Sequence, residues 1–285
     1  MEEAIRKAEV LIEALPYIKE FHRKILVIKY GGSILGEEKI RRGVLEDIVF
    51  LSYMGLCPVL VHGGGPNISE RMKSAGLKTE FVNGMRVTDE KTLAIVQEEL
   101  DKLNQMIVNE IQELGGKAAG FSGKDKNIIF ARKKLEGGID LGLVGEVDAI
   151  EAKPILTQTR EYTICVICPM GMARDGKMYN INADDAASAI ASGLHAEKLV
   201  VLTNVKGIMR SVNDPGSFLS TLTIDEARGL IEEKVVQEGM IPKVKACISA
   251  LEGGVNKTHM IDARIPHGLL LEVFTNEGVG TEIVK

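Results

Sequence analysis

Two lysines stand where a cation is unfavourable unless an anion lies beside it. Lys29 follows the apolar run of residues 25–28 and precedes two glycines, and Lys243 falls in the first turn of a predicted helix. A charge at a buried strand end is costly without a carboxylate or phosphate partner, and the helix dipole disfavours a cation at the N-terminus. A bound anion would reverse both arguments. The alternative for Lys243 is an exposed side chain that reaches solvent.

Asp184 is one carboxylate that could partner Lys29. It follows Asn182, a good N-cap, and together with Asp185 it opens a predicted helix that runs to Leu194. Acidic residues in a first helical turn complement the positive end of the dipole. Helix charge alone explains Asp184 as well as a pairing with Lys29 does, so both interpretations stay open.

Two glycine turns add backbone donors to these charges. The glycines at 31 and 32 follow residues 25–28, and those at 63–65 follow the apolar run of residues 58–61. Glycine lets the backbone approach a ligand closely, and the N–H groups of a helix start point at an anion. Neither turn matches a Walker A loop or a dinucleotide-binding fingerprint. Together with Lys29, the turns indicate a protein that handles a phosphorylated ligand and a second small molecule.

The elements that position these residues alternate between strands and helices. Such alternation predicts an α/β fold with a mostly parallel central sheet covered by helices on both faces. Predicted strands are residues 25–28, 58–61, 163–168, 198–202, 259–261 and 271–274, with several shorter strands joined by glycine turns over 118–147. Predicted helices are residues 4–18, a segment through Ile68 and Met72, residues 93–114, 182–194, a helix opened by the capping box Thr223–Glu226, and one that starts near Pro242 and ends at Gly253.

The first predicted helix carries its own apolar stripe, which includes Ile5, Leu11, Ile12 and Leu15. Pro16 is expected to kink or break this helix. The stripe could pack on its own domain or against another subunit.

Composition narrows the class of protein. The 285 residues suit one large α/β domain or two lobes, with 45% hydrophobic and 26% charged residues. A net charge of -5 argues against a nucleic-acid partner. The sequence has no uninterrupted apolar stretch of ~20 residues and no signal-peptide core near its start. We therefore expect a cytoplasmic protein that binds neither membrane nor nucleic acid.

Cys165 and Cys168 have the spacing of a C-x-x-C motif but lie in a predicted strand. Residues three apart on a strand point to opposite faces and cannot share a metal ion. We interpret them as small apolar core residues and predict no protein metal site.

Five motifs occur in the order seen in the amino acid kinase family, which the chain resembles over residues 25–285. They are Lys29-Tyr30-Gly31-Gly32-Ser33, His62-Gly63-Gly64-Gly65-Pro66, Asn83-Gly84-Met85-Arg86-Val87-Thr88, Asn180-Ile181-Asn182-Ala183-Asp184 and Gly239-Met240-Ile241-Pro242-Lys243-Val244. The resemblance implies an αβα sandwich in two lobes. Residues 1–24 would form an oligomerisation helix, residues 25–195 a lobe that binds an acyl amino acid, and residues 196–285 a nucleotide-binding lobe.

The resemblance also implies a reaction, the ATP-dependent phosphorylation of the side-chain carboxylate of N-acetyl-L-glutamate in arginine biosynthesis, with Mg²⁺ carried by the nucleotide. In that reaction Lys29 and Lys243 would stabilise the transferring phosphoryl group, and Asp184 would hold both lysines. The implied substrate-binding residues are Gly64, Gly65, Arg86 and Asn180. The implied nucleotide-binding residues are Gly32, Asn204, Val205, Lys206, Gly207, Ile208, Met209, Val235, Val236 and Gln237. Family members more often carry Asp at position 204.

The expected chemistry needs no general base, because a carboxylate acceptor is already ionised at neutral pH. Phosphoryl transfer then depends on alignment and on charge neutralisation. The alternatives are a related kinase that acts on another acidic amino acid or an acylated aminoadipate, and a nucleotide-dependent regulatory protein without catalysis.

The N-terminal helix acquires a role through the same resemblance. Members of the family that arginine inhibits carry such an extension, through which dimers interlock into a hexameric ring. Their effector lies between this helix and the C-terminal region, here residues 267–280. We therefore expect arginine inhibition and a homo-oligomer, a dimer that assembles into a hexamer as a trimer of dimers.

Overall fold

One sheet runs through the computed structural model, which describes residues 1–122, 128–211, 214–236, 239–275 and 278–285. The strand order is β12-β14-β13-β11-β1-β2-β8-β5, and the β13–β14 pair is antiparallel while the other neighbours are parallel. The strands are β1 (Ile25–Tyr30), β2 (Cys57–His62), β5 (Ala118–Phe121), β8 (Ile164–Ile167), β11 (Lys198–Thr203), β12 (Thr221–Thr223), β13 (Lys257–Asp262) and β14 (Thr281–Val284). The predicted mostly parallel sheet is confirmed.

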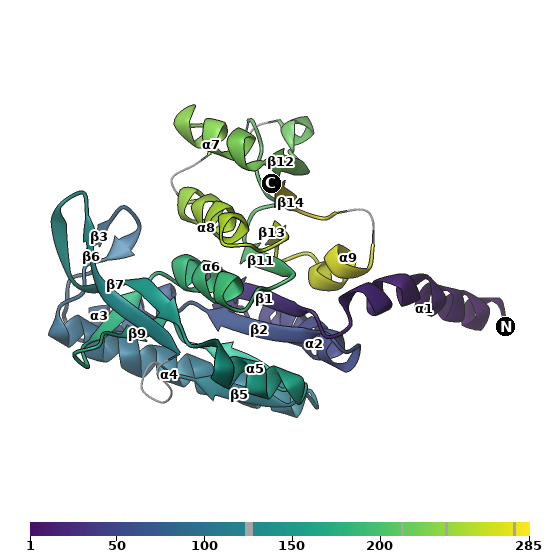
Figure 1. Cartoon of the computed structure of the whole chain (residues 1–285), viewed down its shortest axis with the longest axis horizontal. Coiled ribbons are helices and arrows are strands. Elements are labelled where there is room, and N and C mark those ends of the chain that lie inside the picture. Colours follow the sequence, from purple (N-terminus) through teal and green to yellow (C-terminus); the bar gives the residue numbers. More distant parts are fainter. Residues whose placement is uncertain (123–127, 212–213, 237–238, 276–277) are drawn as a thin grey trace.

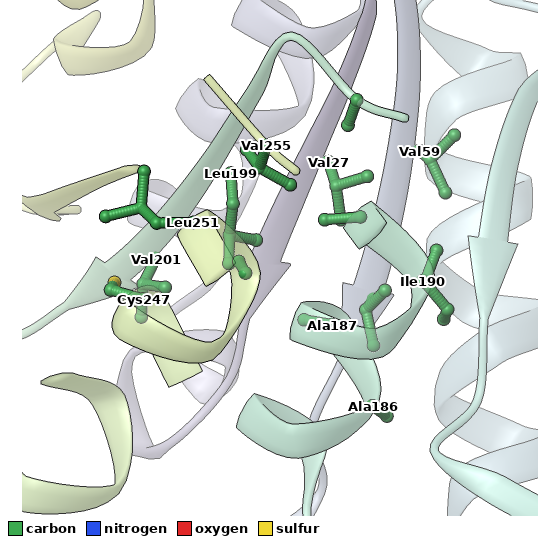
Figure 2. Packing of buried hydrophobic residues seen from close by; sticks show 14 of the residues in the cluster. Val27, Val59, Ala186, Ala187, Ile190, Leu199, Val201, Cys247, Leu251 and Val255 are labelled. Carbon is green, nitrogen blue, oxygen red and sulfur yellow. The ribbon is translucent and has the colours of Figure 1, made fainter. Parts of the chain in front are cut away.

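Helices cover both faces of this sheet (Figure 1). On one face, α6 (Ala183–Gly193) and α8 (Ile241–Glu252) place Ala187 and Cys247 against Val27 and Val201 (Figure 2). On the other face, α2 (Glu38–Tyr53), α4 (Glu90–Glu113) and α9 (Gly268–Phe274) bury a separate cluster against the opposite side chains of β1, β2 and β11. Continuous apolar strands are required here because both faces are covered. The described part of the chain also contains the helices α1 (Glu2–Phe21), α3 (Gly65–Ser74), α5 (Ala152–Arg160) and α7 (Ile224–Glu232).

Cys165 and Cys168 fall in different hydrophobic clusters. Cys165 packs in the cluster under α6 and α8, and Cys168 packs with Met72 and Leu100. The two side chains therefore pack in different clusters, although Cys168 follows β8 instead of lying in it, and both thiols are buried.

A small closed barrel stands beside the main sheet. It consists of β6 (Ile129–Glu136), β7 (Ile139–Ile150), β9 (Met170–Met172) and β10 (Met178–Ile181). The sequence indicated shorter strands over 118–147, with Gly142 as one of the breaks. Instead β7 continues through Gly142, which has a positive φ of 78° and lies so close to the Thr88 carbonyl that a Cβ would collide with it. That glycine serves a close contact between two backbone segments, not the end of a strand.

A two-residue hairpin precedes α4. It pairs β3 (Phe81–Val82) with β4 (Met85–Arg86), and its turn residues Asn83 and Gly84 have φ values of 49° and 79°. Asn-Gly is the favoured pair for such a turn, because both positions require the left-handed region.

Two predicted helix starts are confirmed by their caps. The Asn182 side chain accepts hydrogen bonds from the backbone N–H groups of Asp184 and Asp185. Thr223 and Glu226 form the reciprocal capping box at the start of α7. Both caps fix where their helices begin.

Two further expectations were wrong, that Pro16 breaks the first helix and that residues 271–274 form a strand. Helix α1 (Glu2–Phe21) runs through Pro16. Its last turn is anchored because Phe21 is buried, and this packing offsets the hydrogen bond that proline cannot make. Residues 271–274 lie in α9, not in a strand, because Leu269, Glu272 and Val273 are the buried members and follow helical spacing. The strand near this end is β14, which the sequence did not indicate.

Helix α1 projects away from the body of the molecule (Figure 1). Val10, Leu11 and Ile12 are 57%, 66% and 69% exposed, so its apolar stripe does not pack on its own chain. Among the helices that the structure describes, none has the length and apolarity needed to cross a membrane.

Candidate active site

The two glycine turns meet at the carboxyl ends of neighbouring strands. Strands β1 and β2 pair in parallel with Tyr30 opposite His62, and the Gly63 N–H donates a hydrogen bond of 2.8 Å to the Tyr30 carbonyl. A Cβ on Gly31 would lie 3.1 Å from the Gly63 backbone, so a side chain there would force the two turns slightly apart. Gly32 has a φ of 82°, which favours glycine.

Lys29, Asp184 and Lys243 meet beside these turns. The Lys29 Nζ lies 2.9 Å from Asp184 Oδ1, and the Lys243 Nζ lies 3.7 Å from Asp184 Oδ2. Lys29 comes from the end of β1, and the other two come from the first turns of α6 and α8. Lys29 and Asp184 are buried, so their charges face each other with little solvent between them. The structure therefore answers the question left open for Asp184, which both complements the α6 dipole and pairs with Lys29.

The pKa values in this cluster follow from burial and charge. Burial alone would raise the pKa of Asp184, but the Lys29 and Lys243 ammonium groups bring it below its usual value. Burial lowers the pKa of Lys243, Asp184 opposes this effect, and Lys29 adds to it. A further anion beside Lys243 would favour its charged form.

A cavity of about 200 Å³ opens beside this cluster. Its lining contains most of the residues that the sequence singled out for catalysis and acceptor binding, namely Lys29, Gly32, Gly64, Gly65, Arg86, Asn180 and Asp184. Lys243 is outside the lining and reaches the cluster through Asp184.

Arg86 brings a buried positive charge to this cavity. Its guanidinium donates to the Gly65 carbonyl at 3.0 Å and to Ser69 Oγ at 2.8 Å, and it lies 4.7 Å from the centre of the Phe81 ring. Burial lowers its pKa. Within the described ranges no carboxylate pairs with Arg86, although it is only 6% exposed. A carboxylate on a ligand would supply the missing countercharge.

Asn180 and the hairpin complete the wall. The Asn180 Nδ2 donates to Thr88 Oγ1 at 3.2 Å, and Thr88 in turn donates to the Arg86 carbonyl at 2.7 Å. Phe81 and Gly84 of the hairpin also line the cavity, and a Cβ on Gly84 would lie 3.9 Å from Pro242 at the start of α8. Phe81 and Thr88 were not predicted as site residues from the sequence, although the Asn83-Gly84 pair signals the hairpin that carries Phe81.

The segment proposed for the nucleotide lies apart from this cavity. Residues 204–209 follow the carboxyl end of β11, where Thr203 Oγ1 donates to the Val205 carbonyl at 2.7 Å and Thr281 Oγ1 accepts from the Ile208 N–H at 2.8 Å. These bonds shape residues 205–208 into a fixed loop beside β11. In sequence after α7, Val235 is half-buried and Val236 is buried. Gln237 lies outside the described residues.

A larger cavity of about 510 Å³ lies between α2 and the segment that follows β13. It contains neither the lysine pair nor a glycine turn among its lining residues. Of these two cavities, the smaller one has Lys29 and residues of both glycine turns in its lining.

The chain is similar to known proteins over nearly its whole length. A model described as "Amino acid kinase family" matches residues 24–262. The chain is 50% identical over 282 residues to an acetylglutamate kinase from Petrotoga mobilis, with 99% of this chain and 94% of the relative covered. It is 47% identical over 295 residues to an acetylglutamate kinase from Heliobacterium modesticaldum, with both chains covered in full.

Solved structures share the fold. An N-acetylglutamate synthase from Neisseria gonorrhoeae, complexed with coenzyme A and N-acetyl-glutamate, superposes with a TM-score of 0.87 at 28% identity. The same synthase complexed with coenzyme A and L-arginine gives 0.83 at 27%. These matches cover 98% of this chain but 63% and 65% of the synthase chains, less than two thirds of their length. A carbamate kinase from Giardia lamblia bound to AMP-PNP gives 0.65 at 16% identity, covering 92% of this chain and 99% of that one.

Proposed function

The chain belongs to the amino acid kinase family and is a kinase, and on that premise we propose that it phosphorylates N-acetyl-L-glutamate. The reaction would transfer the γ-phosphoryl group of ATP to the side-chain carboxylate, giving N-acetyl-L-glutamyl 5-phosphate and ADP in arginine biosynthesis. The observation that carries this proposal is the ion cluster of Lys29, Asp184 and Lys243 where the two glycine turns meet. The acetylglutamate kinases that match over nearly the whole chain support the choice of acceptor.

The acceptor would bind through its two carboxylates. Arg86 offers a buried guanidinium for the α-carboxylate, and Asn180 stands beside it on β10. The side-chain carboxylate would then face the glycine turn of Gly64 and Gly65. It is ionised at neutral pH and can attack the γ-phosphorus directly. One P–O bond forms, the bond to the β-phosphate oxygen breaks, and ADP leaves with that electron pair.

Lys29 and Lys243 would stabilise the phosphoryl group while it is transferred. Negative charge spreads over the phosphoryl oxygens in the transition state, and preorganised ammonium groups stabilise it without reorganisation. Asp184 contacts both Nζ atoms, so it holds the two cations close together in the absence of phosphate. The nucleotide would lie along the Gly32 turn and residues 204–209, with Val235, Val236 and Gln237 at its border.

Mg²⁺ would neutralise phosphate charge in this reaction. Asp184 is a buried carboxylate in the lining of the proposed acceptor cavity, and lysines contact both of its oxygens. Kinase sites commonly bind Mg²⁺ through substrate phosphates and water together with one or two carboxylates. We therefore propose that the nucleotide carries the ion. In this proposal residues 25–195 would form the lobe that binds the acyl amino acid, and residues 196–285 would form the lobe that binds the nucleotide.

An ADP-release assay with a panel of acceptors tests the reaction. We expect turnover with N-acetyl-L-glutamate and at least 100-fold lower kcat/KM with L-glutamate, L-aspartate, N-acetyl-L-aspartate and N-acetyl-L-2-aminoadipate. A preference for another acidic amino acid would assign the chain to a different kinase of the family. No ADP release with any acceptor would refute the proposed function.

We further propose that arginine inhibits this enzyme at another cavity, of about 420 Å³, which differs from the two described above. The end of α1 contributes Tyr17 and Glu20 to its lining, and Glu272 and Glu282 contribute carboxylates that suit a guanidinium. Burial would raise the pKa of Glu272, but a contact of 2.6 Å with His259 Nδ1 brings it below its usual value. The related synthase solved with L-arginine supports this choice of ligand.

The exposed stripe of α1 supports a hexamer built from three dimers. Several of its apolar side chains are more than half exposed, which is unfavourable unless another subunit covers them. Deleting residues 1–22 should leave a dimer with weaker inhibition by arginine. Mass measurement in solution together with an arginine titration of activity checks this. A truncated protein that remains a hexamer with full arginine sensitivity would contradict the proposal.

A further inference from the structure

His62 lies directly beneath the glycine turn of the acceptor site. It ends β2, is 0% exposed, and precedes Gly63 and Gly64. Its Nδ1 lies 3.2 Å from the Gly63 carbonyl oxygen. Its Nε2 lies 3.2 Å from Asn104 Nδ2 and 3.3 Å from Cys168 Sγ. The imidazole therefore connects the glycine turn to α4 and to the residue that follows β8.

The direction of each hydrogen bond in this cluster can be assigned from its acceptors. The Val166 carbonyl, which can only accept, lies 2.9 Å from Asn104 Nδ2, so the nitrogen of that amide must face it. The second hydrogen of Nδ2 is then directed at His62 Nε2, which must accept. A neutral imidazole that accepts at Nε2 carries its proton on Nδ1, and this proton is donated to the Gly63 carbonyl.

The neutral form of the ring is favoured independently. Burial lowers the pKa of His62 to about 4, against a smaller opposite effect of its bond to Gly63. The Cys168 thiol can donate to the same Nε2 or to the Leu100 carbonyl at 3.5 Å. A proton on Nε2 would oppose the Asn104 donor, so the network itself selects the tautomer.

The bond to Gly63 determines where the next N–H points. A peptide unit is planar and trans, so its C=O and N–H are directed oppositely. Holding the Gly63 carbonyl toward the His62 ring therefore turns the Gly64 N–H away from it. Gly64 lines the cavity, and the Gly63 N–H is fixed on its other side by Tyr30. Both peptide units that include Gly63 are thus held by hydrogen bonds.

We propose that His62 is a positioning residue for the acceptor, which fixes the Gly63–Gly64 peptide so that the Gly64 N–H points at the acceptor carboxylate. The inference rests on the proposed function, because it assumes that this turn binds the acceptor. Asn104 acts behind His62 by holding the Nδ1–H tautomer. Glycine needs this support more than other residues, since its backbone is otherwise free to rotate.

Two amide substitutions distinguish the role of the Nδ1 atom of His62 from the role of its Nε2 atom. In His62→Asn the side-chain amide stands near the former Nδ1 and can still donate to Gly63, whereas in His62→Gln it stands near the former Nε2 and serves Asn104 instead. The packing loss is similar in both. We expect His62→Gln to raise KM for N-acetyl-L-glutamate about tenfold, the scale of one hydrogen bond to a charged group. His62→Asn should stay within about threefold of the unmodified enzyme, and KM for ATP should change little in either.

Equal KM values in the two variants, or an equal rise in KM for ATP, would show that His62 has a structural role alone. A ¹⁵N spectrum of the unmodified full-length protein provides a test that does not depend on the folding of a variant. We expect the Nδ1–H tautomer at pH 7.5, and an Nε2–H tautomer would overturn the inference. If the unmodified enzyme releases no ADP with any acceptor, the proposed function fails, whereas activity with an Nε2–H tautomer means that the positioning role alone fails.

Discussion

Replacing Asp184 by asparagine removes the negative charge between two lysines while keeping the size of the side chain. At an effective dielectric constant of about 20, unit charges at the 2.9 Å and 3.7 Å seen here attract by about 6 and about 4.5 kcal/mol. Desolvation consumes much of this attraction, so breaking such a buried pair costs about 3–5 kcal/mol. The variant can reduce that cost by releasing a proton from a lysine.

Lys243 is the lysine whose pKa burial already lowers. Removing the Asp184 charge leaves burial and the Lys29 charge unopposed, so the pKa of Lys243 falls further. The substitution therefore favours the neutral form of Lys243 at high pH. We expect kcat at pH 8 to fall at least ~100-fold, the scale for one preorganised stabilising group. Part of the activity should return as the pH is lowered, because Lys243 then regains its proton.

The assay is ADP release between pH 5.5 and 9.5, with Asp185→Asn as the matched control. Asp185 stands in the same turn of α6, but its partly exposed carboxylate pairs with Lys134 at 3.1 Å. The control removes the same charge from the same helix start without touching the lysine pair. An Asp184→Asn enzyme with an unchanged pH profile, or an equal loss in Asp185→Asn, would refute the reasoning.

Two further predictions concern Arg86 and the contact between α2 and α9. Arg86→Lys keeps the charge but loses the hydrogen bonds of the guanidinium to Gly65 and Ser69. KM for the acceptor should therefore rise about tenfold or more while KM for ATP stays constant. Steady-state kinetics with each substrate varied would check this, and an equal change in both KM values would contradict it. His267 donates to buried Asp47 at 2.6 Å, and this bond raises the His267 pKa. The charged pair therefore stabilises the fold fully below the unfolded histidine pKa of ~6.5 and loses its effect as the pH rises through the raised folded value. His267→Gln should cost on the order of 1 kcal/mol at most at pH 6 and less at pH 9, measured by urea unfolding, and a cost that grows with pH would be inconsistent with this account.

The main sheet and most helices could be predicted because local patterns agree with the tertiary structure. Strands buried on both faces, such as β1 and β2, are continuous apolar runs, and caps such as Asn182 mark helix starts by their own hydrogen bonds. Lys29 and Lys243 were found because each is locally unfavourable without an anion. Sequence rules are informative at a site when a residue violates them.

The features that were missed depend on contacts between distant segments. Gly142 is a glycine because the Thr88 carbonyl crosses it, and Pro16 is tolerated because Phe21 anchors the same helix. Residues 271–274 are apolar enough for a strand, and the packing of Val273 on the core is what favours the helix α9 over a strand. Phe81 is the exception, because the Asn83-Gly84 turn places it directly opposite Arg86, and this local signal could have assigned it to the site.

In the proposed reaction, the backbone bond between Gly63 and Tyr30 would also limit which acceptors react. Because β1 and β2 are adjacent strands, their turns are expected one interstrand spacing apart, about 4.8 Å. The distance between the reacting groups would then be set by main-chain pairing within a sheet, not by the closure of side chains. An acceptor that is one methylene shorter or longer would place its carboxylate out of line, and a misplacement of about 1 Å can cost about 100-fold in rate. We therefore expect chain-length selectivity to survive most single substitutions in the wall of the cavity.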